Sequence, residues 1–151
     1  MFRGFDCLNM DAKGRLVMPS RYHERIHAGC QGRFVITVDL HEDCLVIYPL
    51  MEWEKIEHSF NALPSSNKAL ALLKRRILGY ATEVQMDGSG RLLVSPELRS
   101  FAALDKEVVL AGQGKKCELW NKSAWDAMNA KAMAADFSSA ELASAIDALA
   151  L

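Results

Sequence analysis

The stretch MDAKGRLVMP at residues 10–19 returns later in the chain as MDGSGRLLVSP at residues 86–96. Methionine, aspartate, glycine, arginine and leucine recur in register, and apolar residues follow the leucine in both copies. The second copy has one extra residue before its proline. Because a supersecondary unit that occurs twice leaves this kind of internal similarity, the sequence predicts two copies of one unit in tandem.

The similarity continues on the C-terminal side of both copies. Residues 19–22 parallel residues 96–99, residues 34–38 parallel residues 108–111, and residues 44–48 parallel residues 117–120. Tyr48 and Trp120 are each followed five residues later by a tryptophan. The separation of about 75 residues is longer than the repeats of a solenoid, so it indicates a tandem pseudo-dimer.

Each copy contains the pattern of a β-hairpin. The segment before each aspartate alternates apolar and polar residues, as a half-buried strand does. In D-x-x-G the aspartate can accept hydrogen bonds from turn amides, and Gly14 or Gly90 can adopt a positive φ, which favours a type I turn with a glycine bulge. The returning strands at residues 16–18 and 92–94 are apolar throughout, and we expect them to be buried on both faces.

A short helix after the proline and two further strands complete each copy. The sequence therefore predicts an α+β, β-rich fold made of two tandem strand–turn–strand–helix–strand–strand repeats with peripheral helices. We expect the first repeat to span residues 1–64, a linking helix residues 65–80, the second repeat residues 81–125, and a helical tail residues 126–151.

Two of the peripheral helices have recognisable ends. The apolar spacing of residues 70–77 predicts a helix that stops at Gly79. In the tail, Ser138-x-x-Glu141 has the pattern of a capping box at the start of a helix. The tail is rich in alanine, which favours helix but buries little area, so we expect it to be loosely held or to pack on a neighbouring subunit.

The charge of the chain is nearly balanced. It has 18 Lys and Arg, 19 Asp and Glu, and a formal net charge of -1. This balance argues against nucleic-acid binding by overall charge alone. Residues 1–33, however, carry six basic and three acidic residues, so a local basic face can form.

The cysteines and the apolar segments indicate a cytoplasmic protein. Cys7, Cys30, Cys44 and Cys117 include no C-x-x-C pair, and we expect free, mostly buried thiols, no zinc site and no cofactor. The chain begins without the apolar stretch of a signal peptide, and no run is long enough to cross a membrane. We therefore expect no membrane partner.

The strongest candidates for a binding site are the arginines at the base of the two turns. Arg15 and Arg91 can each grip a phosphate with two nitrogens or bind the O6 and N7 acceptors of guanine. Asp11 and Asp87, four residues earlier, can hold these guanidiniums in position, although the same pairs could equally be ordinary surface salt bridges. Lys13 would add a phosphate contact at the first turn.

Other basic residues are weaker candidates. Arg3 and Arg21, together with Arg25 and Arg99, could contact phosphate, but a solvated surface charge is the more ordinary role for each. An enzyme is not expected. His23 and His27 have a spacing that could bind a metal on a helix, but no third ligand accompanies them, and no catalytic motif is present.

The MFRG start, the DAKGR and DGSGR motifs, the repeated proline and the tryptophans together resemble the MraZ family, from Met1 to about Trp125. That family belongs to the AbrB-like, swapped-hairpin group of bacterial DNA-binding proteins. The family's D-x-x-x-R element maps to Asp11 with Arg15 and to Asp87 with Arg91. This chain departs from the family pattern at His23, where arginine is frequent, and at Ser95, where proline is frequent.

The resemblance implies an AbrB-like swapped-hairpin β-barrel and a ring-shaped homo-oligomer. It also implies a transcriptional regulator that binds double-stranded DNA at repeated promoter sites of the division and cell-wall gene cluster, including its own promoter, in the cytoplasm at the nucleoid. The competing hypothesis is a purely structural oligomerisation module that binds protein partners through the alanine-rich tail without contacting DNA.

Overall fold

The structure is a computed structural model that describes residues 1–151. The first repeat contains β1 (Phe5–Asn9), β2 (Arg15–Val17), η1 (Ser20–Tyr22), α1 (His23–Cys30), β3 (Arg33–Val38) and β4 (Leu45–Pro49). The helices α2 (Leu50–Asn61) and α3 (Lys68–Tyr80) follow. The second repeat contains β5 (Thr82–Gln85), β6 (Arg91–Leu93), α4 (Pro96–Phe101), β7 (Glu107–Gly112) and β8 (Cys117–Asn121), followed by α5 (Lys122–Ala134) and α6 (Ala140–Ala148).

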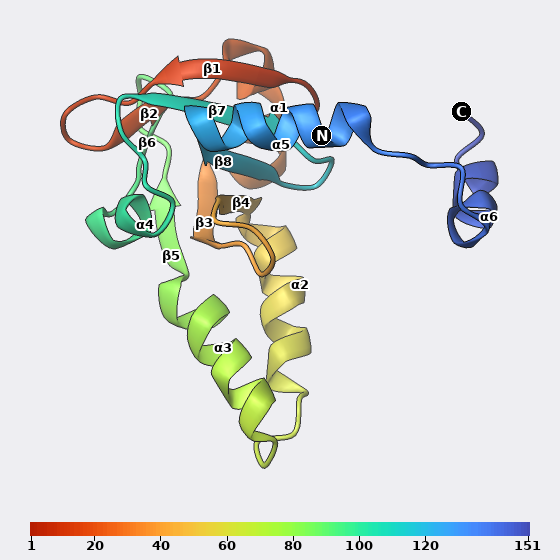
Figure 1. Cartoon of the computed structure of the whole chain (residues 1–151). Helices are drawn as coiled ribbons and strands as arrows, with labels where there is room; N and C mark the ends of the chain where they lie inside the picture. Colours follow the sequence, from red (N-terminus) through yellow and green to blue (C-terminus); the bar gives the residue numbers. More distant parts are fainter.

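Six strands form one antiparallel sheet in the order β1-β7-β8-β4-β3-β5 (Figure 1). The first strand of each repeat pairs with the other repeat: β1 lies beside β7, and β5 lies beside β3. At the centre of the sheet, β4 pairs with β8, so the two repeats share one continuous structure. The predicted α+β fold of two tandem repeats with exchanged hairpins is therefore confirmed.

The second strands of the two hairpins pair with each other as a separate ribbon, β2–β6. Its register is symmetric about the facing pair Leu16 and Leu92. Beyond the ladder, Met18 N donates to Gly90 O at 2.8 Å, and Val94 N donates to Gly14 O at 2.9 Å. These bonds tie each returning strand to the turn of the opposite repeat.

One face of the sheet carries the main hydrophobic core. Its fully buried side chains come from the four central strands, from the ribbon and from the short helices α1 and α4: Phe34, Ile36, Leu45, Ile47, Leu110, Leu119, Leu16, Leu92, Ile26 and Leu98. Each large aliphatic or aromatic side chain contributes about 1.5–3 kcal/mol by leaving water. The ribbon is thus anchored to the body of the protein through one of its two faces.

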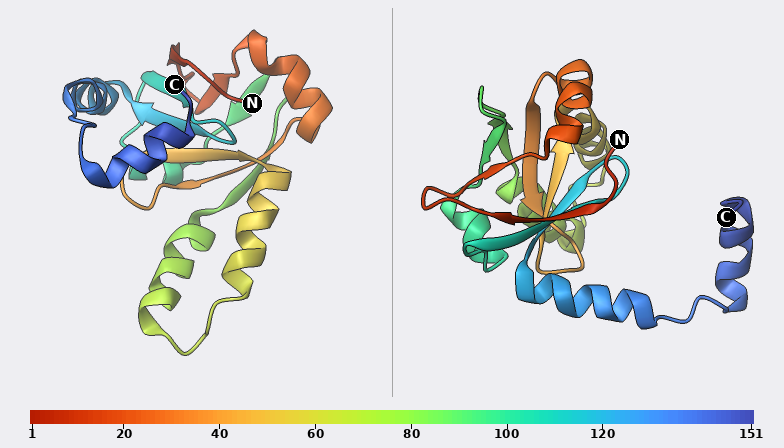
Figure 2. Two further views of the ribbon diagram at one scale, coloured as in Figure 1. Left: turned by 90° about the vertical axis from the view of Figure 1, so that its right-hand side faces the viewer. Right: turned by 90° about the horizontal axis from the view of Figure 1, so that it is seen from above.

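The opposite face of the sheet is covered only in part. A small cluster of Cys44, Val109 and Trp120 packs against Trp125 of α5. Helices α2 and α3 project from the sheet as a hairpin, and α6 lies at the end of an extended segment, away from the sheet (Figures 1 and 2). None of the helices combines the length and the apolarity needed to span a membrane.

Several local predictions are wrong. The returning strands are not buried on both faces, because Val17 and Leu93 are half exposed. Helix α6 begins after Ser139 without a side-chain cap, since the Ser138 hydroxyl bonds Asp136 instead of capping α6. Gly79 lies inside α3 rather than after it.

The alignment of the two prolines is also wrong. Pro19 precedes η1, and its counterpart is Ser95, whose hydroxyl caps α4 by accepting a hydrogen bond from Leu98 N at 3.4 Å. Pro96 then occupies the first turn of α4. The equivalent bonds of Met18 and Val94 to the opposite turns fix this correspondence, so the two copies stay in register past the strands and the second copy has no extra residue before Pro96.

Candidate nucleic-acid interface

The first hairpin turn is held together by Asp11. Its backbone forms the turn, since Gly14 N donates to Asp11 O at 3.0 Å and Asp11 N donates to Arg15 O at 2.9 Å. Its Oδ1 accepts hydrogen bonds from Lys13 N at 3.0 Å and Arg15 N at 2.8 Å. Gly14 has φ +85°, which a residue with a side chain adopts only with strain. The predicted type I turn with a glycine bulge is confirmed.

The second turn repeats this geometry. Asp87 Oδ1 accepts hydrogen bonds from Ser89 N and Arg91 N, both at 2.9 Å, and Gly90 has φ +77°. In each turn the second carboxylate oxygen holds the arginine. Arg15 Nε lies 2.7 Å from Asp11 Oδ2, and Arg91 Nε lies 2.8 Å from Asp87 Oδ2.

The two aspartates engage only the Nε edge of each guanidinium. The Nη1 and Nη2 atoms of Arg15 and Arg91 have no hydrogen-bond partner within the chain. The side chains of Arg15 and Arg91 are 30% and 34% exposed. Because Leu16 and Leu92 face the core and side chains alternate along a strand, both arginines lie on the outward face of one ribbon. The forked ends of both guanidiniums are therefore available on a common surface.

The hydrogen bonds in the turns also lower the pKa of both aspartates. Backbone N–H donation from Arg15 is the largest cause at Asp11, and donation from Arg91 is the largest at Asp87. A carboxyl group whose pKa is lower in the folded state stabilises the fold above its unfolded pKa, and this contribution disappears as the pH falls below that value.

We therefore expect the double variant Asp11→Asn/Asp87→Asn to be less stable than the unmodified protein at pH 6. The difference should shrink as the pH falls below the ordinary carboxyl pKa of 3.8. Urea unfolding at a series of pH values measures it. A stability difference that stays constant down to about pH 2.5 would contradict the ionised role of these carboxylates.

Each turn rests on a side chain from the opposite repeat, which sequence analysis missed. His23 Nε2 lies 2.8 Å from Met18 O, and its ring lies against Gly90, where an added Cβ would be 2.7 Å from Cε1. Arg99 Nε donates to Val94 O at 3.1 Å, and an added Cβ on Gly14 would be 2.6 Å from that nitrogen. His23 and Arg99 are thus equivalent residues, although the sequence alignment had paired Arg99 with Tyr22.

The remaining predicted residues lie in different surroundings. Lys13 is exposed at the tip of the first turn. Arg3 is exposed near the N-terminus, and its carbonyl accepts a hydrogen bond from the Tyr22 hydroxyl. Arg21 is already engaged by Asp6, with Nη1 2.7 Å from Oδ1 and Nη2 2.5 Å from Oδ2. Both Nη atoms of Arg21 are therefore already hydrogen-bonded to a carboxylate, unlike those of Arg15 and Arg91.

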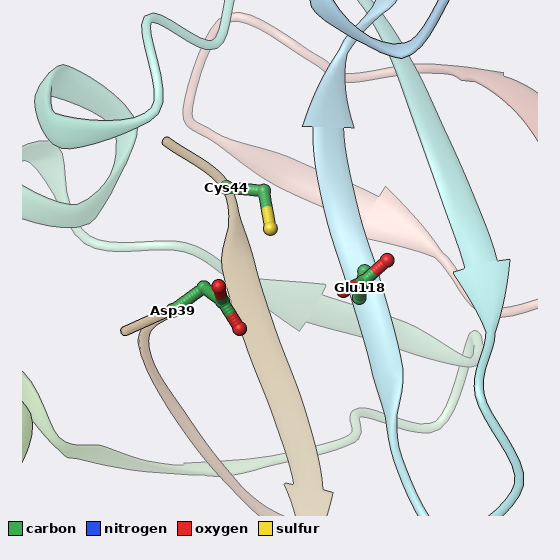
Figure 3. Close-up of side chains that lie close together, drawn as sticks. All are labelled: Asp39, Cys44 and Glu118. Carbon is green, nitrogen blue, oxygen red and sulfur yellow. The ribbon is translucent and has the colours of Figure 1, made fainter. Parts of the chain in front are cut away.

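All four cysteines are free; Cys7 is exposed and the other three are buried. Cys44 lies beside two carboxylates, Asp39 and Glu118, with their candidate ligand atoms within 4.8 Å of one another (Figure 3). Burial raises the pKa of the Cys44 thiol.

Both carboxylates of this cluster have partners in the chain. Asp39 Oδ2 caps the turn between β3 and β4 by accepting His41 N and Glu42 N, both at 2.9 Å. Glu118 Oε1 accepts Trp120 Nε1 at 3.2 Å. These bonds assign Asp39 to the turn between β3 and β4, and Glu118 to the orientation of the Trp120 ring.

A duplicated β-hairpin, exchanged between two halves of one chain and carrying an arginine at each turn, defines the class of two-repeat swapped-hairpin proteins. The chain matches the family model described as "MraZ protein" twice, over residues 1–76 and 77–147. It belongs to the MraZ family, as the sequence motifs indicated.

Curated relatives agree with this assignment. A protein of Halorhodospira halophila is 50% identical over 155 aligned positions that cover all of both chains. A protein of Pseudomonas putida is 47% identical over 135 positions, 89% of each chain, and one of Thioalkalivibrio sulfidiphilus is 50% identical over 125 positions, 83% of each chain. Each is named "Transcriptional regulator MraZ", which is the name of a regulator and not of an enzyme, as the sequence predicted.

Proposed function

We propose that this chain is a transcriptional regulator that binds double-stranded DNA through Arg15 and Arg91. The proposal rests on one observation. Both guanidiniums lie on the outward face of the same ribbon, and their Nη atoms have no hydrogen-bond partner within the chain. A two-stranded ribbon fits the major groove of B-form DNA, and a guanidinium fork matches the acceptors of guanine and of phosphate. The name of the relatives is consistent with this chemistry.

The proposed particle contains several copies of the chain. A single ribbon with two arginines would bind weakly, whereas a ring that carries many ribbons gains avidity on repeated sites.

We propose that residues 1–64 and 81–125 act as the two DNA-contacting units, joined by residues 65–80. Residues 126–151 form a tail. Lys13 and Arg3 add phosphate contacts near the first unit, and Arg21 adds one only when a phosphate displaces Asp6 from its guanidinium. The targets are repeated sites in the promoter of the division and cell-wall gene cluster, including the protein's own gene, and binding occurs in the cytoplasm at the nucleoid.

Salt dependence and footprinting test this function together. On a duplex that carries the region upstream of the protein's own gene, we expect a regularly spaced footprint. Affinity should fall by about 1,000-fold between about 50 and 200 mM salt, because each neutralised phosphate releases counterions. A random duplex of equal length is the control for the footprint.

Two results would contradict the proposal. An affinity independent of salt would exclude phosphate contacts. The absence of any footprint, combined with an intact oligomer, would favour the interaction-module hypothesis, for which the exposed helix α6 is the natural contact.

A further inference from the structure

The outward face of the ribbon carries two apolar side chains as well as the two arginines. Val17 is 50% exposed and Leu93 is 52% exposed, whereas Leu16 and Leu92 beside them are fully buried. In the register of the ribbon, Arg15 lies directly opposite Leu93, and Val17 lies directly opposite Arg91. The face is therefore a checkerboard of two guanidiniums and two apolar groups, to which each repeat contributes one arginine and one apolar residue at equivalent positions.

The position of these apolar groups requires an explanation. A single exposed valine or leucine is ordinary on a protein surface. Here, however, each repeat places one at the same site, in direct cross-strand contact range of an arginine, since facing side chains in an antiparallel pair lie about 5 Å apart. Any molecule that engages the forks of Arg15 and Arg91 must also cover Val17 and Leu93.

The major groove of DNA offers partners for both kinds of side chain. Guanine presents O6 and N7 to an arginine, and thymine presents the apolar C5-methyl group. A separation of about 5 Å between facing side chains corresponds to one or two base-pair steps of about 3.4 Å. The checkerboard therefore suits a short site in which thymine lies within one or two steps of guanine.

Resting on the function proposed above, we propose that Val17 and Leu93 are specificity-determining residues that contact the C5-methyl groups of thymines in the major groove. A second copy of the chain is a poorer occupant of this face. It would have to bury two guanidiniums whose Nη atoms have no acceptor in the chain, which is costly without a matching acid. DNA supplies the acceptors and the methyl groups together.

The test removes only the methyl groups. Binding is measured by fluorescence anisotropy with two duplexes that span the footprinted upstream region, one with thymine and one with deoxyuridine in its place. The unmodified protein should bind the thymine duplex about tenfold more tightly, because several small apolar contacts are lost at once. The double variant Val17→Ala/Leu93→Ala should bind both duplexes equally, at about the affinity of the unmodified protein for the deoxyuridine duplex. Leu40→Ala, another exposed apolar residue outside the ribbon, should keep the full discrimination.

The possible results are distinct. If the unmodified protein binds both duplexes equally, or if the double variant still prefers the thymine duplex, the proposed contact with the thymine methyl groups is wrong. The proposed function stands in either case. If the double variant changes the particle mass in size-exclusion chromatography, the face is an interface between copies and the proposal is overturned. If the unmodified protein does not bind the thymine duplex at all, the proposed function itself fails.

Discussion

Arg15→Ala is expected to weaken binding to the proposed upstream sites severely and to leave the particle mass unchanged. The substitution removes a guanidinium whose forked end has no partner inside the protein. The turn survives, because Asp11 Oδ1 still accepts the backbone N–H groups of residues 13 and 15. Losing a bidentate base contact weakens binding by about 5- to 150-fold per site. In the proposed multimeric particle, which would engage several sites, the factors multiply, so the loss should exceed about 100-fold.

Gel-shift titration at one fixed salt concentration, together with size-exclusion chromatography, measures this effect. Arg33→Ala is the matched control, because Arg33 is also ion-paired, with Glu83 at 2.9 Å, but lies on β3 away from the ribbon. Arg15→Lys should give an intermediate affinity, since lysine keeps the charge and loses the planar fork. If Arg15→Ala binds as tightly as Arg33→Ala, the ion pair of Arg15 serves only the turn.

Gly112→Ala should have the largest effect on stability. Gly112 N donates to Gly4 O at 2.8 Å, and the N-terminal segment passes directly over this glycine. An added Cβ would collide with the backbone N of Arg3 and lie 2.6 Å from the carbonyl carbon of Phe2. Since both are backbone atoms, no rotamer change relieves the clash, and the N-terminal segment must move away. Phe2 is 2% exposed, so its displacement should lower the free energy of unfolding by about 3 kcal/mol.

Urea unfolding provides the measurement, and a double-mutant cycle identifies the cause. If Gly112→Ala has already displaced Phe2, adding Phe2→Ala should cost little more, whereas Phe2→Ala alone should be strongly destabilising. Gly88→Ala is the control, because an added Cβ there meets no atom within 4 Å. Additive effects of the two substitutions would show that the segment stays in place.

Sequence reasoning was most successful where a local pattern determines a local structure. The D-x-x-G-R turns, with Asp11 and Arg15 paired, form as expected because the aspartate, the glycine and the arginine all act within five residues. The alternation of buried and exposed side chains along residues 15–17 could not be predicted in this way. An apolar run cannot indicate which of its side chains faces the core, so the exposure of Val17 was not predictable before its partner strand was known.

The features that sequence reasoning missed join residues of different repeats. His23 supports the turn at Gly90, and Arg99 supports the turn at Gly14, over separations that no sequence window spans. Aligning Pro19 with Pro96 shifted the second copy by one residue and so hid this equivalence. In the structure Ser95, not Pro96, occupies the position of Pro19 at the start of the short helix. The exchange of β1 and β5 between repeats was expected only through the family resemblance, since hydrophobic periodicity says nothing about which strands become neighbours.

The exchange of the first strands constrains how the chain reaches its native state during synthesis. β1 leaves the ribosome early, but its only partner, β7, is translated roughly a hundred residues later. Until then the N-terminal half has an unsatisfied strand edge, and its folding has to wait for contacts that are distant in sequence, which slow the rate of folding. Because each half lends its first strand to the other, we expect a nascent chain that stops before β7 to be exposed to aggregation through that edge.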